Sequence, residues 1–214
     1  MDLKKYGFTK EEIRLVKKLK TPEKIQEFID NSIIYDPEKE DRNVLQVIRD
    51  KKAECYNGAL LATTCLIYHG YECTLIELTA VKDEEHILAV YKKDGNYGSI
   101  AQSKFQGLRY RHPMYQSLRD LVVSYMEFYI AFDGRYTLSS YSNWKDLSKY
   151  NLRFLDDSYV VRKISLDLRK SKHNNIINYN LPEFYANPKR FWSEVGVIPP
   201  DIKIPKKYLS LLNK

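Results

Sequence analysis

The sequence lacks the hallmarks of membrane and secreted proteins. None of its 214 residues lie in an apolar run approaching the roughly 18 to 20 residues that a membrane span requires. Residues 1–18 are rich in charge and lack the apolar stretch of a signal peptide. Only three cysteines are present, and this odd number does not fit a secreted disulfide framework. We therefore expect a cytoplasmic protein without membrane contact.

The composition predicts a packed core and an uneven charge distribution. Hydrophobic residues make up 43% of the chain and charged residues 29%, which is typical of folded domains. Residues 141–214 hold 14 Lys/Arg against 7 Asp/Glu, so they carry the whole net charge of +7. We expect a core over residues 1–140 and a basic C-terminal extension over residues 141–214. Its basic run at residues 169–173 is either a phosphate- or acid-binding segment or a solvated surface strip.

Three helices are expected before residue 55, within residues 9–20, 21–33 and 41–54. In the first helix Thr9 can cap the N-terminus and Glu12 can complete a capping box. In the second helix Thr21 can cap the N-terminus. These patterns predict an α-helical N-terminal third.

A fourth helix is predicted over residues 55–68, with Gly70 as its stop signal. One face of it would carry small and apolar side chains at residues Cys55, Ala59, Ala62 and Leu66. Such a face suits close packing on a sheet. Cys55 would therefore begin a buried helix and face inward at its N-terminal end.

Strands are predicted at residues 73–81, 86–93 and 96–103, the last two forming a hairpin around Asp94-Gly95. A long helix is expected from about Met114 to Phe132, and residues 158–168 alternate like one more strand.

Cys55 is the candidate nucleophile. The N-terminus of a helix favours a thiolate, and a neighbouring histidine can take the thiol proton. Cys65 lies in mid-helix and Cys73 starts a strand, so both are expected to be buried small hydrophobes. His86 begins the first hairpin strand, whereas His69 ends the Cys55 helix about 20 Å away, at 1.5 Å per residue.

The order of these parts resembles the transglutaminase-like branch of the papain-like cysteine enzymes over roughly residues 20–105. The segments "AECYNGALLA", "DEEHILAVYKKDGNYGSIAQSKF" and "GLRYRHPMYQSLRDLVVSYMEFY" are similar to an uncharacterised prokaryotic family of transglutaminase-like proteins, up to about residue 141. The resemblance implies an α+β fold with N-terminal helices and the cysteine helix packed on an antiparallel sheet.

The resemblance implies that Cys55 is the nucleophile and His86 the base. The family's third residue, an aspartate on the following strand, has no counterpart. A turn centred on Asp94-Gly95 places His86 opposite Ser103, so Ser103 is the candidate, or Gln102 if a bulge shifts the register. Neither side chain stabilises an imidazolium as a carboxylate does.

Arg109 and Arg111 follow the hairpin and are candidates for binding a substrate carboxylate. The alternative is a structural salt bridge to the acidic residues 83–85. The sequence implies no metal and no cofactor.

Two functions follow from this interpretation. The first is a cysteine-dependent amide hydrolase or acyltransferase acting on a peptide, a protein or a small amide. The second is a catalytically inactive transglutaminase-like module that binds a protein or nucleic-acid partner, including an acidic partner at the basic C-terminal segment.

Overall fold

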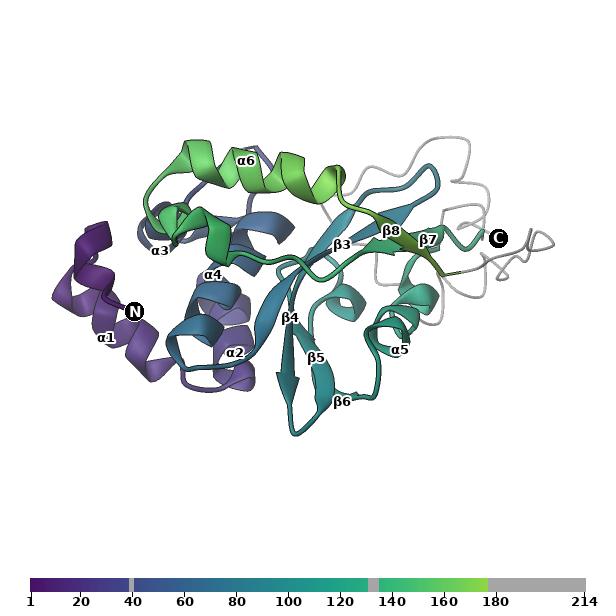
Figure 1. Cartoon of the computed structure of the whole chain (residues 1–214), viewed down its shortest axis with the longest axis horizontal. Helices are drawn as coiled ribbons and strands as arrows, with labels where there is room; N and C mark the ends of the chain where they lie inside the picture. The colour runs from purple at the N-terminus through teal and green to yellow at the C-terminus, as the bar shows by residue number, and fades with distance from the viewer. Residues whose placement is uncertain (39–40, 131–134, 177–214) are drawn as a thin grey trace, which may run out of the picture.

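The first helices begin where the sequence supplies caps. The computed structural model describes residues 1–38, 41–130 and 135–176 (Figure 1). Its first elements are η1 (Leu3–Tyr6), α1 (Lys10–Lys18), α2 (Pro22–Ser32) and α3 (Val44–Asp50). Thr9, Thr21 and Asn43 each accept a hydrogen bond from the backbone N–H three residues later, which satisfies one of the unpaired donors of each helix start. The three expected helices are confirmed.

The helix α4 (Cys55–Tyr68) is the centre of the fold. It begins and ends where the sequence predicted, and all its residues from Tyr56 to Leu66 are buried. Two short parallel strands, β1 (Ile34–Tyr35) and β2 (Lys52–Ala53), lie just before its start. Figure 1 shows α1, α2 and α3 grouped around α4. A helix that is apolar on all sides is stable only inside such a shell.

The sheet has six antiparallel strands in the order β6-β5-β4-β3-β7-β8. The strands are β3 (Cys73–Ala80), β4 (His86–Lys93), β5 (Asn96–Ile100), β6 (Arg111–Tyr115), β7 (Leu138–Ser142) and β8 (His173–Asn175). Asp94 and Gly95 both have positive φ, at 51° and 80°, as a two-residue hairpin turn requires. The predicted hairpin is confirmed, and Val90 pairs with Ser99 as its turn implies.

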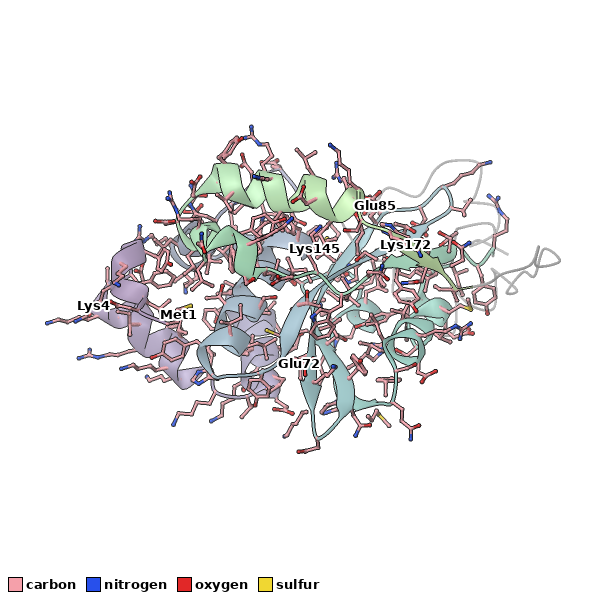
Figure 2. All side chains as sticks on the ribbon, in the orientation of Figure 1. Met1, Lys4, Glu72, Glu85, Lys145 and Lys172 are labelled. Carbon is pink, nitrogen blue, oxygen red and sulfur yellow. The ribbon has the colours of Figure 1, made fainter. Side chains whose placement is uncertain are left out.

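The two faces of the sheet carry separate cores. On β4, Ile87, Ala89 and Tyr91 pack with α4 and the N-terminal helices. Leu88 and Val90 pack on the opposite side with residues of α5 (Leu118–Val123) and its neighbours. Figure 2 shows side chains filling the space on both sides of the sheet. The alternation of a strand thus decides which core each side chain enters.

Two secondary-structure predictions are wrong. Residues 158–168 form not a strand but the helix α6 (Ser158–Arg169), which Asp157 caps. Its apolar residues Val161, Ile164 and Leu168 have helical spacing and are buried. Packing of this apolar face on the core therefore favours a helix, although the sequence also alternates between apolar and polar residues as a strand does. The long helix expected over residues 114–132 is instead β6, α5 and the 3-10 helix η3 (Met126–Phe128).

The expected boundary near residue 140 falls inside β7. This strand pairs with β3, and β8 pairs with β7, so both belong to the sheet. Between them lie α6 and two 3-10 helices, η4 (Ser148–Tyr150) and η5 (Arg153–Leu155), whose apolar side chains enter the α4 core. Residues 141–176 therefore complete the core, while the rest of the expected extension lies outside the described residues.

Among the described residues, none of the helices is long and apolar enough to cross a membrane.

Candidate functional site

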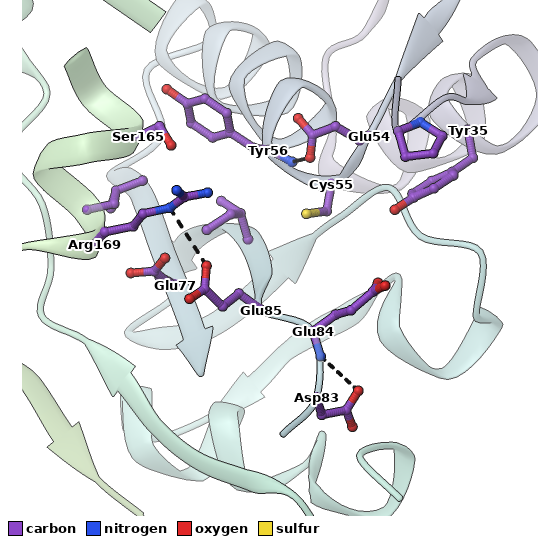
Figure 3. A pocket seen from close by; sticks show the side chains of 13 residues that line it. Tyr35, Glu54, Cys55, Tyr56, Glu77, Asp83, Glu84, Glu85, Ser165 and Arg169 are labelled. Atoms are coloured by element: carbon purple, nitrogen blue, oxygen red, sulfur yellow. Dashed lines mark hydrogen bonds and ion pairs between the residues drawn. The ribbon is translucent and has the colours of Figure 1, made fainter. Parts of the chain in front are cut away.

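A pocket opens at the N-terminal end of α4. It has a volume of about 440 Å³ and lies between the start of α4, the β3–β4 loop and the C-terminal end of α6. Figure 3 shows the Cys55 sulfur directed into this space. The acidic residues that line it are Glu54, Glu77, Asp83, Glu84 and Glu85. Arg169 is the only Lys or Arg among the described lining residues, so the pocket is strongly acidic.

The start of α4 is capped by the residue that precedes Cys55. The two carboxylate oxygens of Glu54 accept hydrogen bonds from the backbone N–H groups of Tyr56, at 2.6 Å, and Asn57, at 2.8 Å. An anion at this position is favoured by the helix dipole and by the unpaired N–H groups. Glu54 therefore occupies the positive end of the helix that would otherwise stabilise a thiolate.

The electrostatics around Cys55 differ from the sequence-based expectation. Burial, followed by the negative charge of Glu54, raises the pKa of the Cys55 thiol well above its usual value. Backbone N–H groups of Ile87 and Tyr56 lower this pKa, but by less. Burial also raises the pKa of Cys65 and of Cys73 to about 12. Burial, and after it the acidic cap, therefore oppose the thiolate that the helix start was expected to favour.

His86 is turned away from this pocket. It lies at the start of β4 and is buried, and its Nε2 is 2.8 Å from the carbonyl oxygen of Leu108. A carbonyl only accepts, so the proton of a neutral His86 sits on Nε2. Burial lowers the pKa of His86 to about 4, so the ring is neutral at pH 7.

No hydrogen bond or ion pair joins Cys55 to His86 within the described parts of the chain. Leu108 belongs to the core on the far face of the sheet, and Arg111 adds a further charge that disfavours the imidazolium. Ile87, the next residue of β4, is the one that lines the pocket and approaches the thiol. The structure therefore brings Cys55 to the backbone of β4 at Ile87, while the described partner of the His86 ring is the Leu108 carbonyl.

Ser103 and Gln102 have structural partners. The Gln102 amide donates to the Ile33 carbonyl, and its oxygen accepts from the Ser103 backbone N–H. The Ser103 hydroxyl accepts from the Phe105 backbone N–H. Neither side chain is hydrogen-bonded to His86 among the described residues, because the His86 partner is a carbonyl after β5.

Neither Arg109 nor Arg111 lines the pocket. Arg109 forms an ion pair with Asp30 at 2.7 Å. Arg111 donates to the Gly107 carbonyl and stacks over the Tyr125 ring, with 4.0 Å from its guanidinium carbon to the ring centre. Neither forms a described ion pair with residues 83–85; both fix the segment after β5.

Two residues at this site were not identified from the sequence. Glu77 lies on β3 and is only 2% exposed, yet it lines the pocket. His173 lies on β8, and its Nε2 is 3.2 Å from Oε2 of Glu77. A charged residue inside the apolar stretch "CTLIELTA" was the available signal for Glu77, since a buried carboxylate requires a partner. His173 came into reach only through the pairing of β7 with β8.

No group of three or more histidine, cysteine, aspartate and glutamate side chains suited to hold a metal ion occurs among the described residues. The described lining of the pocket includes a thiol, carboxylates, one guanidinium and the hydroxyl-bearing residues Tyr35, Tyr56 and Ser165.

Comparison with known proteins adds no identification: the chain matches no family model and no curated protein.

Proposed function

We propose that the chain is a cysteine-dependent amide hydrolase or acyltransferase of papain-like, transglutaminase-like type, with Cys55 as its nucleophile. The observation that carries the proposal is the Cys55 thiol, which starts a central helix and opens into a pocket of about 440 Å³. A cysteine helix packed on an antiparallel sheet, with a hairpin following it, is the arrangement that the sequence resemblance implies.

The acidic lining favours a substrate that carries a positive charge near the scissile amide or on the acceptor amine. Glu54 is 7% exposed and Glu77 2%, so their carboxylates act in a region of low dielectric. A cation between them gains much more than it would in water. A peptide, a protein segment or a small amide with a basic group meets this requirement, whereas a nucleic acid does not.

Binding of such a substrate also activates the thiol. In the unliganded pocket the negative charge of Glu54 raises the pKa of Cys55. A bound cation cancels part of this repulsion, so the Cys55 thiol loses its proton more readily once the pocket is filled. The sulfur then attacks the amide carbonyl, and the thioester passes its acyl group to water or to an amine.

The test uses p-nitrophenyl acetate as an acyl donor, because its leaving group needs no proton. The full chain should become acetylated at Cys55, as located by peptide mapping, and the Cys55→Ala variant should lose this modification. Cys65→Ala is the matched control and should remain acetylated at Cys55. Acetylation that persists at the same rate in Cys55→Ala, on another residue, would overturn the proposal.

A second candidate is a binding module without chemistry. The raised pKa of Cys55, together with the His86–Leu108 bond, favours it. In that function the acidic pocket holds a basic side chain of a protein partner. The basic run at residues 169–173 does not favour nucleic acid, because Arg169 faces Glu85 and His173 faces Glu77.

Binding of spermidine, a compact polycation, distinguishes the enzyme from the non-catalytic binding module. Both predict that it binds and that Glu54→Gln weakens the binding, with a strong dependence on salt. Only the enzyme predicts that spermidine also changes the rate at which p-nitrophenyl acetate acetylates Cys55. Binding without any acetylation of Cys55 would select the non-catalytic module.

A further inference from the structure

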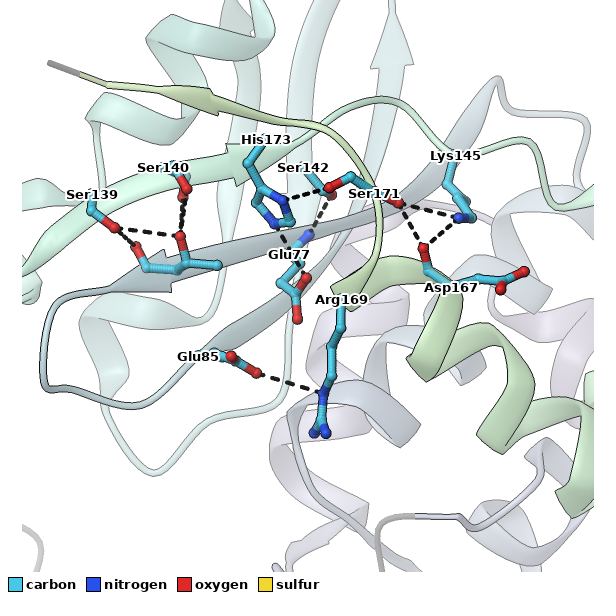
Figure 4. Close-up of polar contacts among 11 residues, drawn as sticks. Glu77, Glu85, Ser139, Ser140, Ser142, Lys145, Asp167, Arg169, Ser171 and His173 are labelled. Atoms are coloured by element: carbon cyan, nitrogen blue, oxygen red, sulfur yellow. Dashed lines mark hydrogen bonds and ion pairs between the residues drawn. The ribbon is translucent and has the colours of Figure 1, made fainter. Parts of the chain in front are cut away.

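Glu77 and His173 form a buried pair at the wall of the pocket. Figure 4 shows His173 of β8 directed across Ser142 of β7 toward Glu77 of β3. The backbone N–H of Glu77 on β3 donates to the hydroxyl of Ser142 on β7 at 2.9 Å. Three neighbouring strands thus hold the two side chains in a fixed relation.

The geometry leaves room for one proton between the two side chains. Nδ1 of His173 lies 2.8 Å from the carbonyl oxygen of Ser171, which only accepts, so Nδ1 carries a hydrogen. Nε2 of His173 then faces Oε2 of Glu77 at 3.2 Å. Two lone pairs at that distance would repel, so one of the two atoms carries a proton, although neither meets the geometry of a hydrogen bond with a described residue. The pair is neutral in either form.

One oxygen of Glu77 remains available to a ligand. Its Oε1 makes no hydrogen bond or ion pair with any described residue and, unlike Oε2, is not among the fully buried polar atoms. A carboxylate oxygen without a donor can accept a hydrogen bond from a ligand or from water. The space before it is the pocket that also contains the Cys55 thiol (Figure 3).

Glu77 and Cys55 approach the same point of the sheet. Glu77 is the cross-strand partner of Ile87, and the backbone N–H of Ile87 is the one that approaches the Cys55 sulfur. Directly opposed residues of antiparallel strands have Cα atoms about 4.5 to 5.5 Å apart. An acyl group on Cys55 therefore lies within reach of Oε1, either directly or through one water.

We propose that Glu77 is the acid and base of the pocket and that His173 is the residue that positions it and shares its proton. This inference rests on the proposed acyl-transfer function. It assigns the proton transfers to β3 and β8 rather than to His86 on β4.

The proton transfers balance without a further reactant. The Cys55 thiol gives its proton to solvent water, and its sulfur bonds to the carbonyl carbon as the C–N bond breaks. The leaving nitrogen takes the proton of the Glu77–His173 pair. Water or an amine then gives a proton to Glu77 and attacks the thioester carbon. The C–S bond breaks, and the sulfur recovers a proton from solvent water.

Charged groups on four sides act on Glu77. Burial raises its pKa, and so does the negative charge of Glu85 on the β3–β4 loop. His173 on β8 and Arg169 on α6 lower it. Glu54 and Cys55 face the same pocket from α4, and Lys145 interacts with Glu77 from the segment after β7. Their net effect is to raise the pKa of Glu77 above its usual value, chiefly through burial, which favours a carboxyl that can donate a proton as well as accept one.

The test separates formation of the acetyl-enzyme from its hydrolysis. After acetylation of the full chain by p-nitrophenyl acetate and removal of the reagent, intact mass reports the loss of the acetyl group. Glu77→Gln should form acetyl-Cys55 within about twofold of the wild-type rate but should lose it about 100-fold more slowly, because general base catalysis is removed. Glu72→Gln, an exposed residue paired with Lys92, is the matched control and should change neither rate.

His173→Gln is a second variant, at the more exposed residue of the Glu77–His173 pair. Removing the imidazole takes away an influence that lowers the pKa of Glu77, so the rise of the deacetylation rate with pH should shift to higher pH. A purely structural role would leave that profile in place. This variant also decides the matter if Glu77→Gln does not fold.

The outcomes are distinct. Equal deacetylation rates for wild type and Glu77→Gln, or an unshifted pH profile in His173→Gln, would overturn the inference alone. A wild-type chain that is not acetylated at Cys55 would overturn the proposed function and this inference with it.

Discussion

The two faces of the sheet treat polar groups differently. On the face toward α5, His86 is buried and neutral, and its ring donates to the Leu108 carbonyl. On the face toward α4 and α6, Glu77 and His173 are paired at the wall of an open pocket. The first arrangement satisfies a polar group, and the second leaves a carboxylate oxygen available.

A single step along β4 separates these two environments. Ile87 faces the pocket and Leu88 faces the other core, so His86 shares the face of Leu88 by the two-residue period of a strand. The order of motifs along the chain places a histidine near a cysteine. The face of the strand then decides whether they form a pair.

The largest expected effect is the loss of folding stability when a charge is placed in the apolar core on the far face of the sheet. Val90 is fully buried in the far core, so Val90→Asp places an unpaired carboxylate among apolar side chains. We expect a loss of more than about 4 kcal/mol in the free energy of unfolding, measured with urea. Val81→Asp, at a position 59% exposed, is the control and should change it by less than about 0.5 kcal/mol. Similar losses in both variants would mean that the far face is not a closed apolar core.

The next effect is the pH dependence that His86 imposes on stability. Its pKa in the folded chain is about 4, below the ordinary value of 6.5, so the unfolded chain binds the extra proton first. The stabilisation is therefore complete above the unfolded pKa and is lost as pH falls toward 4. We expect a loss of about 3 kcal/mol over that interval.

His86→Gln keeps a donor for Leu108 and removes the titration. Urea unfolding at a series of pH values should show that the variant loses about 3 kcal/mol less than wild type between the two pKa values. Parallel pH profiles would exclude a buried neutral His86.

A smaller effect concerns the reactivity of Cys55. Burial and then the negative charge of Glu54 raise the pKa of this thiol, so Glu54→Gln should increase its alkylation by iodoacetamide at pH 7. Cys73 serves as the internal control, because its pKa is raised by burial and by Glu72. Peptide mapping at short times measures both. Slower alkylation of Cys55 in the variant would show that Glu54 activates the thiol instead.

The smallest effect is expected at the rim of the pocket. Arg169 and Glu85 are both about half exposed and lie 3.8 Å apart, so Arg169→Gln should change the free energy of unfolding by less than about 1 kcal/mol. The same variant removes the pocket's cation and should tighten spermidine binding, as measured by calorimetry. Unchanged affinity would mean that spermidine binds elsewhere.

The sequence predicted the elements that local signals specify. Thr9 and Thr21 mark helix starts, and Asp94-Gly95 marks the hairpin, because caps and positive-φ turns depend on a few neighbouring residues. The helix that begins at Cys55 also followed from its own pattern. By contrast, the helix over residues 158–169 depended on a core assembled from distant segments.

The candidate site was harder to predict for the same reason. Cys55 was found because it begins a helix, and it does line the pocket. Burial of its thiol and the acidic cap Glu54 raise the pKa of Cys55, which the helix pattern alone did not predict. His173 and Glu77 are 96 positions apart by their numbers and meet only through the pairing of β8, β7 and β3.

The most direct test of the account is the titration of His86 by NMR, following its ring Cε1–H signal in wild type and in Cys55→Ala. The account predicts a midpoint of about pH 4 that is the same in both proteins, because the ring is buried against Leu108 and independent of the thiol. A midpoint above the ordinary value of 6.5 in wild type that falls in Cys55→Ala would contradict it, since that result requires an imidazolium paired with the Cys55 thiolate.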